Sequence, residues 1–148
     1  QKLTERYAAE MGIGVTAEEK ASYVEHVRAA LRKDPNFAGS GLDAEESAED
    51  KAAREEIATA FIRQWKINRA LYQQYGGRII FQQGGPEPLD AYRNFLDENA
   101  ARGDFKIANQ DLEAGFWRYY RDESIHDFYE PGSTAEAKAF AEPPWLVD

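Results

Sequence analysis

One long stripe of large side chains between residues 48 and 75 constrains the fold more than any other feature of the chain. Its members follow one another at steps of three or four residues: Ile57, Phe61, Trp65, Asn68, Tyr72 and Tyr75. This spacing keeps side chains on one face of an α-helix, and Ile62, Ile67 and Leu71 widen that face. We therefore predict a central helix from about Ala48 to Tyr75, with Ile57, Phe61, Trp65 and Tyr72 largely buried.

Capping residues and glycines place shorter helices on both sides of the central one. Thr16 and Glu19 form a capping-box pattern at the start of one helix, and Asn109 precedes another. Pro86 and Pro88 stand where a helix begins, since a missing N–H costs little there. The expected helices cover residues 2–11, 17–34, 48–75, 88–102 and 134–141, and a further one begins at residue 110. The sequence thus predicts one all-α domain over residues 1–148, with about five or six helices around one long central helix.

Two segments are expected to be extended. The run 78–82 (RIIFQ) is rich in β-branched and aromatic residues and lies between two glycine pairs, and its expected partner is Phe105-Lys106-Ile107. These pieces would form at most a minor two-stranded ribbon. The Pro143-Pro144-Trp145-Leu146 segment is expected to be an extended tail whose tryptophan docks back onto the body.

Composition excludes several classes of function. The 148 residues carry a formal net charge of −9, which repels nucleic-acid phosphates and anionic lipid head groups. No apolar run approaches the roughly 20 residues of a membrane span. The absence of cysteine excludes disulfides and thiolate chemistry. The chain begins with Gln1 rather than Met, which slightly favours export with removal of a signal peptide; a trimmed upstream segment is the other explanation.

A histidine among carboxylates is the first candidate site. If one helix continues through residues 123–130, four residues share a face at positions i, i+3, i+4 and i+7: Glu123, His126, Asp127 and Glu130. A Glu-x-x-His pair on a bundle helix is typical of iron and manganese sites, and a carboxylate beside a histidine also suits acid/base catalysis. However, the chain has no second Glu-x-x-His, and Asp122 can end the helix and turn the cluster outward. We therefore expect these four residues to have a structural role rather than to form a metal or catalytic site.

The aromatic residues of 116–129 are the second candidate site. Phe116, Trp117, Tyr119 and Tyr120 point to more than one side of a helix, so one core face does not accommodate them all. The surplus lines a groove for peptides or small molecules, or else it is covered by the tail and Trp145; we favour the covered arrangement. Asn68 lies within the apolar stripe, where a buried amide more often ties down a neighbouring loop than contacts a ligand.

Known enzyme signatures are absent from the sequence. The glycine pairs at 76–77 and 84–85 lack the Gly-Lys-Ser/Thr of a phosphate-binding loop, and neither a Gly-x-Ser-x-Gly nor a His-Glu-x-x-His motif occurs. We predict no cofactor.

The entry into the second predicted helix resembles a known family. The run 9–19 (AEMGIGVTAEE) is similar to the helix, Gly-Ile turn and Thr-Ala-Glu-Glu start found in the N-terminal domains of SurA-type periplasmic chaperones. The order of elements continues the resemblance over about residues 3–97, through Arg78-Ile79-Ile80 and the proline-started helix with Glu87. It implies an exported helical domain that holds extended, aromatic-rich segments of unfolded proteins, without the catalysis of the family's separate parvulin domains.

We therefore expect a non-enzymatic binding domain, chaperone-like, that takes unfolded or extended polypeptide. The residues expected to bind the peptide are Trp65, Asn68, Tyr72, Phe116, Trp117 and Tyr120. The alternative is a metal-dependent or acid/base enzyme that uses Glu123, His126, Asp127 and Glu130.

Overall fold

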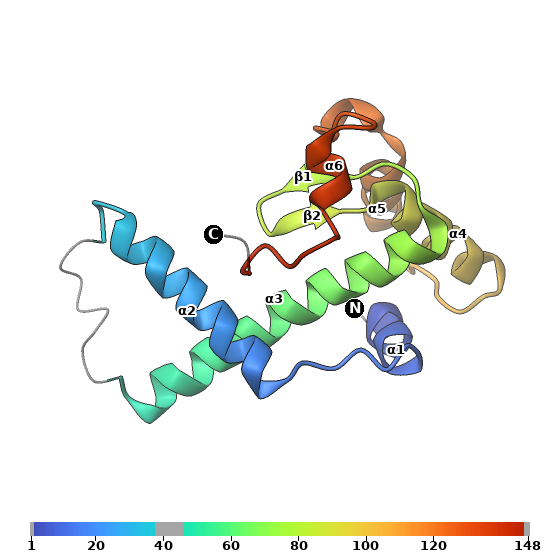
Figure 1. The fold of residues 1–148 in the computed structure, drawn as a ribbon. Helices are drawn as coiled ribbons and strands as arrows, with labels where there is room; N and C mark the ends of the chain where they lie inside the picture. Colours follow the sequence, from blue (N-terminus) through green and yellow to red (C-terminus); the bar gives the residue numbers. More distant parts are fainter. Residues whose placement is uncertain (1, 38–45, 147–148) are drawn as a thin grey trace.

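The central helix predicted from the sequence is the longest element of the structure. A computed structural model describes residues 2–37 and 46–146 of the chain (Figure 1). In it, helix α3 runs from Ala48 to Tyr75 over 28 residues. The Ser47 side chain caps its first turn by accepting a hydrogen bond from the Asp50 N–H, where Glu49 and Asp50 also suit the positive end of the helix dipole.

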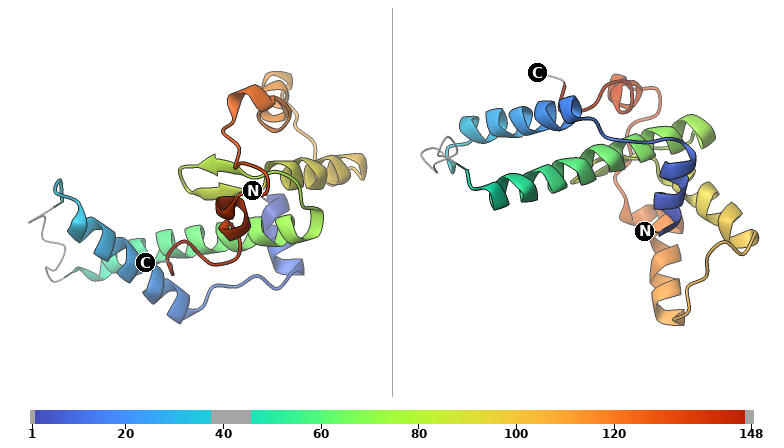
Figure 2. Two further views of the ribbon diagram at one scale, coloured as in Figure 1. Left: turned by 45° about the horizontal axis from the view of Figure 1, so that its top comes forward. Right: turned by 90° about the horizontal axis from the view of Figure 1, so that it is seen from below.

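The other elements are arranged along both halves of α3. They are α1 (Lys2–Glu10), α2 (Ala17–Lys33), β1 (Ile80–Gln82), β2 (Gly85–Glu87), α4 (Leu89–Ala101), α5 (Gln110–Arg121), the single 3-10 turn η1 (Glu123–Ile125) and α6 (Thr134–Lys138). Helix α2 lies alongside the N-terminal half of α3, whereas α1, α4, α5 and the hairpin gather around its C-terminal half (Figures 1 and 2). The mostly helical architecture with six α-helices in the described residues and a two-stranded hairpin confirms the predicted fold class.

Two separate apolar cores flank α3. In the first, Ile67 and Leu71 of α3 pack with residues of α1 and α4, including Tyr7, Tyr92 and Phe95. The second core combines residues of α3 and its surroundings: Ala58, Ile62, Trp65, Ile79, Phe140 and Trp145. Tyr23 and Val24 of α2 pack against it. Helix α3 therefore serves two cores with two different faces, and this explains its length.

This division corrects the predicted burial of the stripe on α3. Trp65 is buried and Tyr72 is half-buried, but Ile57 is 55% exposed and Phe61 is 44% exposed. The buried positions of that half are instead Ala58 and Ile62, both fully buried. Because α2 and the C-terminal tail approach α3 from the side of Ala58, the true contact face is rotated by one residue from the face with the largest side chains.

The hairpin also differs from the predicted ribbon. Strand β1 pairs with β2 in antiparallel register, with Ile80 opposite Glu87 and Phe81 opposite Pro86, so the predicted partner 105–107 is wrong. The Phe81 N–H points away from β2 and donates to the Asp127 carbonyl at 2.9 Å, so Phe81 and Pro86 are not a hydrogen-bonded pair. The missing N–H of Pro86 therefore removes no hydrogen bond between the strands. Tyr129 N–H in turn donates to the Ile79 carbonyl. The second extended neighbour of β1 is thus the segment after η1, and the α4–α5 connection with Phe105 takes no part.

A tight corner joins α3 to the hairpin. Gly77 has a φ of +89°, and a Cβ atom built on it would lie 2.5 Å from the Asp90 Cβ. Asp90 accepts hydrogen bonds from the Arg78 backbone N–H at 2.8 Å and from the Arg78 guanidinium at 2.8 and 3.1 Å. Burial tends to raise the pKa of Asp90, but these hydrogen bonds outweigh it and hold the pKa below its usual value. The corner therefore depends on a bare backbone at Gly77 and an ionised Asp90.

The C-terminal tail docks onto the second core, as expected. Trp145 is 6% exposed and meets Trp65 and Tyr23 edge-on, with ring centroids 5.6 and 5.7 Å apart. The tail forms a turn rather than an extended strand, because the Leu146 N–H donates to the Pro143 carbonyl. In residues 2–37 and 46–146, no helix combines the length and apolar character that a bilayer span requires.

Candidate functional site

An apolar groove of about 690 Å³ lies between α1, α4, α5 and the α4–α5 connection. Its walls are mainly large apolar side chains: Leu3, Tyr92, Leu96, Phe105, Leu112 and Phe116. Leu112, in the first turn of α5, is 67% exposed. Among the described residues, the charged ones that line the groove are Lys2 and Asp111, one of each sign. We call this feature the apolar groove.

Helix α5 buries its apolar face only in part: Phe116, Trp117 and Tyr120 pack half-buried against the first core, and the same face lines the groove. The Asn109 side chain caps the helix by accepting hydrogen bonds from Asp111 N–H and Leu112 N–H, as predicted. Steps of four residues then place Leu112, Phe116 and Tyr120 on one face. No residue of α5 is buried, even though its polar and apolar sides are strongly segregated. An amphipathic helix normally buries such a face, so part of this one is left open.

The predicted peptide-binding residues fall into three places. Phe116 and Tyr120 line the apolar groove. Trp117 lies beside the groove and is half-buried. The Arg121 guanidinium lies 4.3 Å from the centre of its ring, and the Phe105 ring also contacts it. Trp65 and Tyr72 belong to the second core, where Phe140 contacts both rings. The predicted cover of the aromatics on α5 by Trp145 is wrong, because that residue lies in the other core.

Asn68 ties the hairpin to α3 rather than lining a groove. Its amide nitrogen donates to the Pro86 carbonyl at 3.0 Å. Its amide oxygen accepts from the Tyr92 hydroxyl at 2.9 Å and from the Gln64 side chain at 2.8 Å. The buried amide therefore has partners at both ends, which confirms the expectation that it fixes a neighbouring loop.

The histidine and carboxylate cluster does not assemble on one helix. Helix α5 ends at Arg121, and Asp122 caps the separate turn η1 by accepting from Ser124 N–H, as the structural interpretation predicted. Exposed Glu123 pairs with Arg78, and the His126 Nε2 lies 2.5 Å from the Tyr119 carbonyl oxygen. Asp127 and Glu130 are exposed in the extended segment beyond. No group of three or more His, Asp or Glu residues in the described part of the chain is arranged to hold a metal ion.

A different carboxylate occupies a partly buried position that the sequence did not single out for chemistry. The Tyr119 hydroxyl donates to Glu87, with its oxygen 3.0 and 3.1 Å from the two carboxylate oxygens, and it accepts from the Gln82 amide. Burial raises the pKa of Glu87, which the hydrogen bond from Tyr119 partly offsets. Burial and the nearby Glu87 charge also raise the pKa of Tyr119. Neither residue lines the apolar groove. Because Tyr119 lies in α5 and Glu87 in β2, the pair links α5 to the hairpin.

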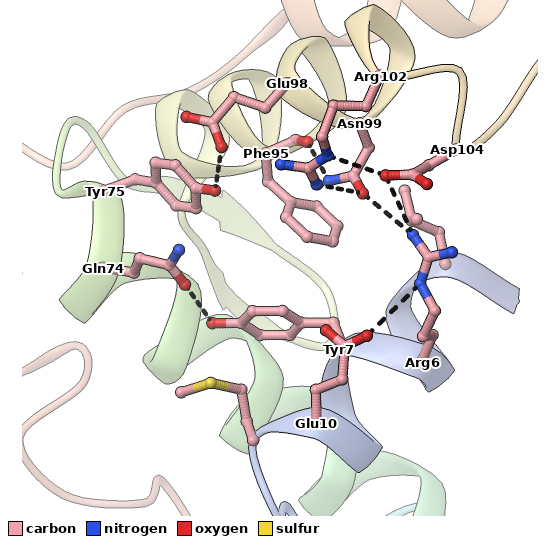
Figure 3. Close-up of a pocket in the computed structure, with 12 residues that line it drawn as sticks. Arg6, Tyr7, Glu10, Gln74, Tyr75, Phe95, Glu98, Asn99, Arg102 and Asp104 are labelled. Atoms are coloured by element: carbon pink, nitrogen blue, oxygen red, sulfur yellow. Dashed lines mark hydrogen bonds and ion pairs between the residues drawn. The ribbon is translucent and has the colours of Figure 1, made fainter.

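A polar pocket of about 450 Å³ lies between α1, α3 and α4 (Figure 3). The Arg6 and Arg102 guanidiniums both approach Asp104 and Asn99, and the Tyr7 and Tyr75 hydroxyls donate to Gln74 and Glu98. The polar groups drawn in Figure 3 thus satisfy one another across α1, α3 and α4. This arrangement holds the helices together and leaves neither arginine as an unpaired cation.

A third hollow, of about 300 Å³, lies between α2, α3, the hairpin turn and the tail. Four aromatic residues contribute to its walls: Tyr23, Phe61, Trp65 and Trp145. The Tyr23 and Phe61 rings are nearly parallel, at 22°, whereas Trp145 stands at 69° to Tyr23 and at 75° to Trp65. We call this feature the aromatic cage.

Known families, curated proteins and solved structures offer no significant match to this chain. The resemblance to SurA-type N-terminal domains therefore stays a prediction.

The sequence predicts only part of the apolar groove. Helical spacing selects Phe116 and Tyr120, but it does not select Leu3, Leu96 or Phe105. The run 105–107 predicts a ribbon strand at Phe105, although its neighbours Gly103 and Asp104 are typical of a loop after a helix. The usable signal was the short run Phe105-Lys106-Ile107 directly before an amphipathic helix, since a loop with two apolar side chains there must cover some surface.

Proposed function

We propose that the protein is a non-enzymatic binding domain whose apolar groove takes extended, apolar segments of other polypeptides. The single observation that carries this proposal is the open apolar face of α5, which lines a groove of suitable size and leaves Leu112 67% exposed. Water contact with such a face is unfavourable, so a segment that covers it gains apolar burial.

The shape and chemistry of the groove favour peptide over a small polar ligand. Its described walls carry aromatic rings and aliphatic side chains, with one charge of each sign on Lys2 and Asp111. Rings and aliphatic groups accept many apolar side chains with little selectivity. A binding site of this kind suits a chaperone-like role, in which a partly unfolded chain exposes alternate large side chains.

The charge of the chain adds a preference for basic segments. A net charge of −9 attracts cationic peptides during diffusional encounter, and dissolved salt screens this attraction. The resemblance to SurA-type domains adds the cell envelope as the place of action, as part of the same proposal. The alternative enzyme based on Glu123, His126, Asp127 and Glu130 gains no support from the positions of these residues.

The test uses fluorescently labelled peptides of about ten residues with alternating aromatic and polar side chains, the pattern of outer-membrane strands. Anisotropy titrations should give dissociation constants in the micromolar range. Leu112→Ala should weaken binding about ten-fold, because it removes roughly 1.4 kcal/mol or more of apolar contact. Ile57→Ala is the matched control, since Ile57 is 55% exposed but does not line the groove.

Ile57→Ala should bind the peptide as the unmodified protein does. A peptide with added lysines should associate faster at low salt and lose that advantage as salt rises. The proposal is wrong if none of these peptides binds, or if Leu112→Ala and Ile57→Ala have equal effects.

A further inference from the structure

The aromatic cage places four aromatic rings around one hollow. Rings at nearly right angles, such as Trp145 against Trp65 and against Tyr23, form adjoining walls around one hollow. Aromatic faces carry negative partial charge, so several faces around one space attract a cation. Phe61 completes the walls and stays 44% exposed, which leaves an entrance from solvent.

Trp65 already attracts a cation within this fold. The Arg69 guanidinium lies 5.5 Å from the centre of its ring. Arg69 does not line the cage, so the space bounded by the other rings is separate from this contact.

The polar lining of the cage discriminates between kinds of cation. The described residues that line it include no Lys, Arg, Asp or Glu; the polar groups are those of His26, Gln83, the Tyr23 hydroxyl, the indole N–H groups of the two tryptophans and nearby backbone. A primary ammonium group is strongly hydrated and needs acceptors for three N–H bonds, usually including a carboxylate. A quaternary ammonium has no N–H groups, so it loses no hydrogen bonds when it enters a cage of rings.

We propose that the aromatic cage binds a small quaternary-ammonium solute of the choline class. The hollow of about 300 Å³ is at the small end of ligand sites, which fits a compact solute better than a long chain. The net charge of −9 makes the surroundings favourable for a cation. The site shares no lining residue with the apolar groove, so it is independent of the proposed peptide binding.

Calorimetric titration of the whole protein at pH 8 with choline and with 3,3-dimethylbutan-1-ol tests the charge requirement. The alcohol has the shape of choline with carbon in place of nitrogen, and it is neutral. Choline should bind in the millimolar range or tighter, and the neutral alcohol should bind at least about five-fold more weakly. Ethanolamine, a primary ammonium of similar length, should also bind more weakly than choline. Equal binding of choline and the alcohol, or no binding of choline, would overturn the proposal.

Two phenylalanine variants test the location. Phe61→Leu keeps an apolar wall but removes its ring, and should weaken choline binding about five-fold. Phe81→Leu is the matched control, since Phe81 is 53% exposed and does not line the cage. Thermal unfolding verifies that both variants are folded; should Phe61→Leu fail this check, the comparison of choline with its neutral analogue on the unmodified protein still decides.

Unchanged choline binding by folded Phe61→Leu would place the ion elsewhere and overturn the assignment to the cage. A trimethyllysine peptide serves as a further arm. If it binds more than ten-fold tighter than choline, the natural occupant is a modified side chain and the assignment to a free solute is wrong.

Discussion

The hydroxyl oxygen of Tyr119 lies 3.0 and 3.1 Å from the two carboxylate oxygens of Glu87. This contact joins α5 to the hairpin strand β2 in a partly buried position. Because α5 buries none of its residues, such polar links and the contacts of its aromatic rings hold it on the body. The same weak attachment leaves its apolar face open to the groove.

Replacement of Glu87 should change how stability depends on pH. Burial raises the pKa of Glu87 in the folded state, so the group favours folding below its unfolded-state pKa and loses this contribution as pH rises through the folded-state pKa. Glu87→Gln does not titrate. Its stability relative to the unmodified protein should therefore be greater at pH 8 than at pH 4, as measured by urea unfolding. Glu56→Gln, at an exposed position of α3, should show no such difference between the two pH values.

The side of α3 that packs against the second core can be tested by two isoleucines. Ile62 is fully buried, so Ile62→Ala should lower the free energy of unfolding by about 2–4 kcal/mol. Ile57 is 55% exposed, and Ile57→Ala should change it by less than about 0.5 kcal/mol. Chemical denaturation of both variants measures the contrast. Equal losses would restore the face that the sequence stripe predicted.

Truncation of Asn68 should release the hairpin. Asn68→Ala removes the donor to the Pro86 carbonyl and the acceptor for the Tyr92 hydroxyl hydrogen, and unsatisfied polar groups at such sites cost about 2–3 kcal/mol together. Gln73→Ala, an exposed amide five residues later in α3, is the control and should be nearly neutral. Hydrogen exchange of the β1 and β2 amides should speed up in Asn68→Ala alone. A loss of stability without faster exchange there would contradict the assigned role.

Local signals made the helices predictable, whereas long-range packing decided what the sequence did not. Thr16 with Glu19 and Asn109 mark helix starts through hydrogen bonds within a few residues, and both caps occur as predicted. The burial of Ala58 rather than Ile57 depends on where α2 and the tail approach α3, which side-chain size alone does not reveal. The choice of Gly85-Pro86-Glu87 as the partner of β1 was equally hidden, since glycine and proline are poor strand formers and the pairing tolerates them only at this register.

The same limit applies to the candidate sites. Phe116 and Tyr120 could be selected because they follow helical spacing on one helix. The aromatic cage combines Tyr23, Phe61 and Trp145, which are far apart in the sequence, and no spacing rule connects them. Asp122 shows the opposite case, since its capping of η1 is local and the end of α5 could be anticipated.

Gly77→Ala should be among the most harmful single changes. The new Cβ would lie 2.5 Å from the Asp90 Cβ, and alanine at a φ of +89° is strained as well. We expect a loss of about 2–4 kcal/mol in the free energy of unfolding. Gly14→Ala is the control, because its Cβ would meet nothing within 4 Å and its backbone is not in the left-handed region. Thermal and urea unfolding of the two variants should differ clearly; similar midpoints would show that the corner relaxes.

The docking of Trp145 between Tyr23 and Trp65 has a consequence for how the protein folds during translation. Helices α2 and α3 leave the ribosome early, but the residue that seals their aromatic surface is made much later. Until then, the nascent chain exposes Tyr23, Trp65 and their neighbours to water, and chaperones or proteases have access to them. Burial of this surface is therefore a late step in biogenesis. Proteins truncated before residue 145 should keep the surface exposed, and we expect them to aggregate and to be degraded rapidly.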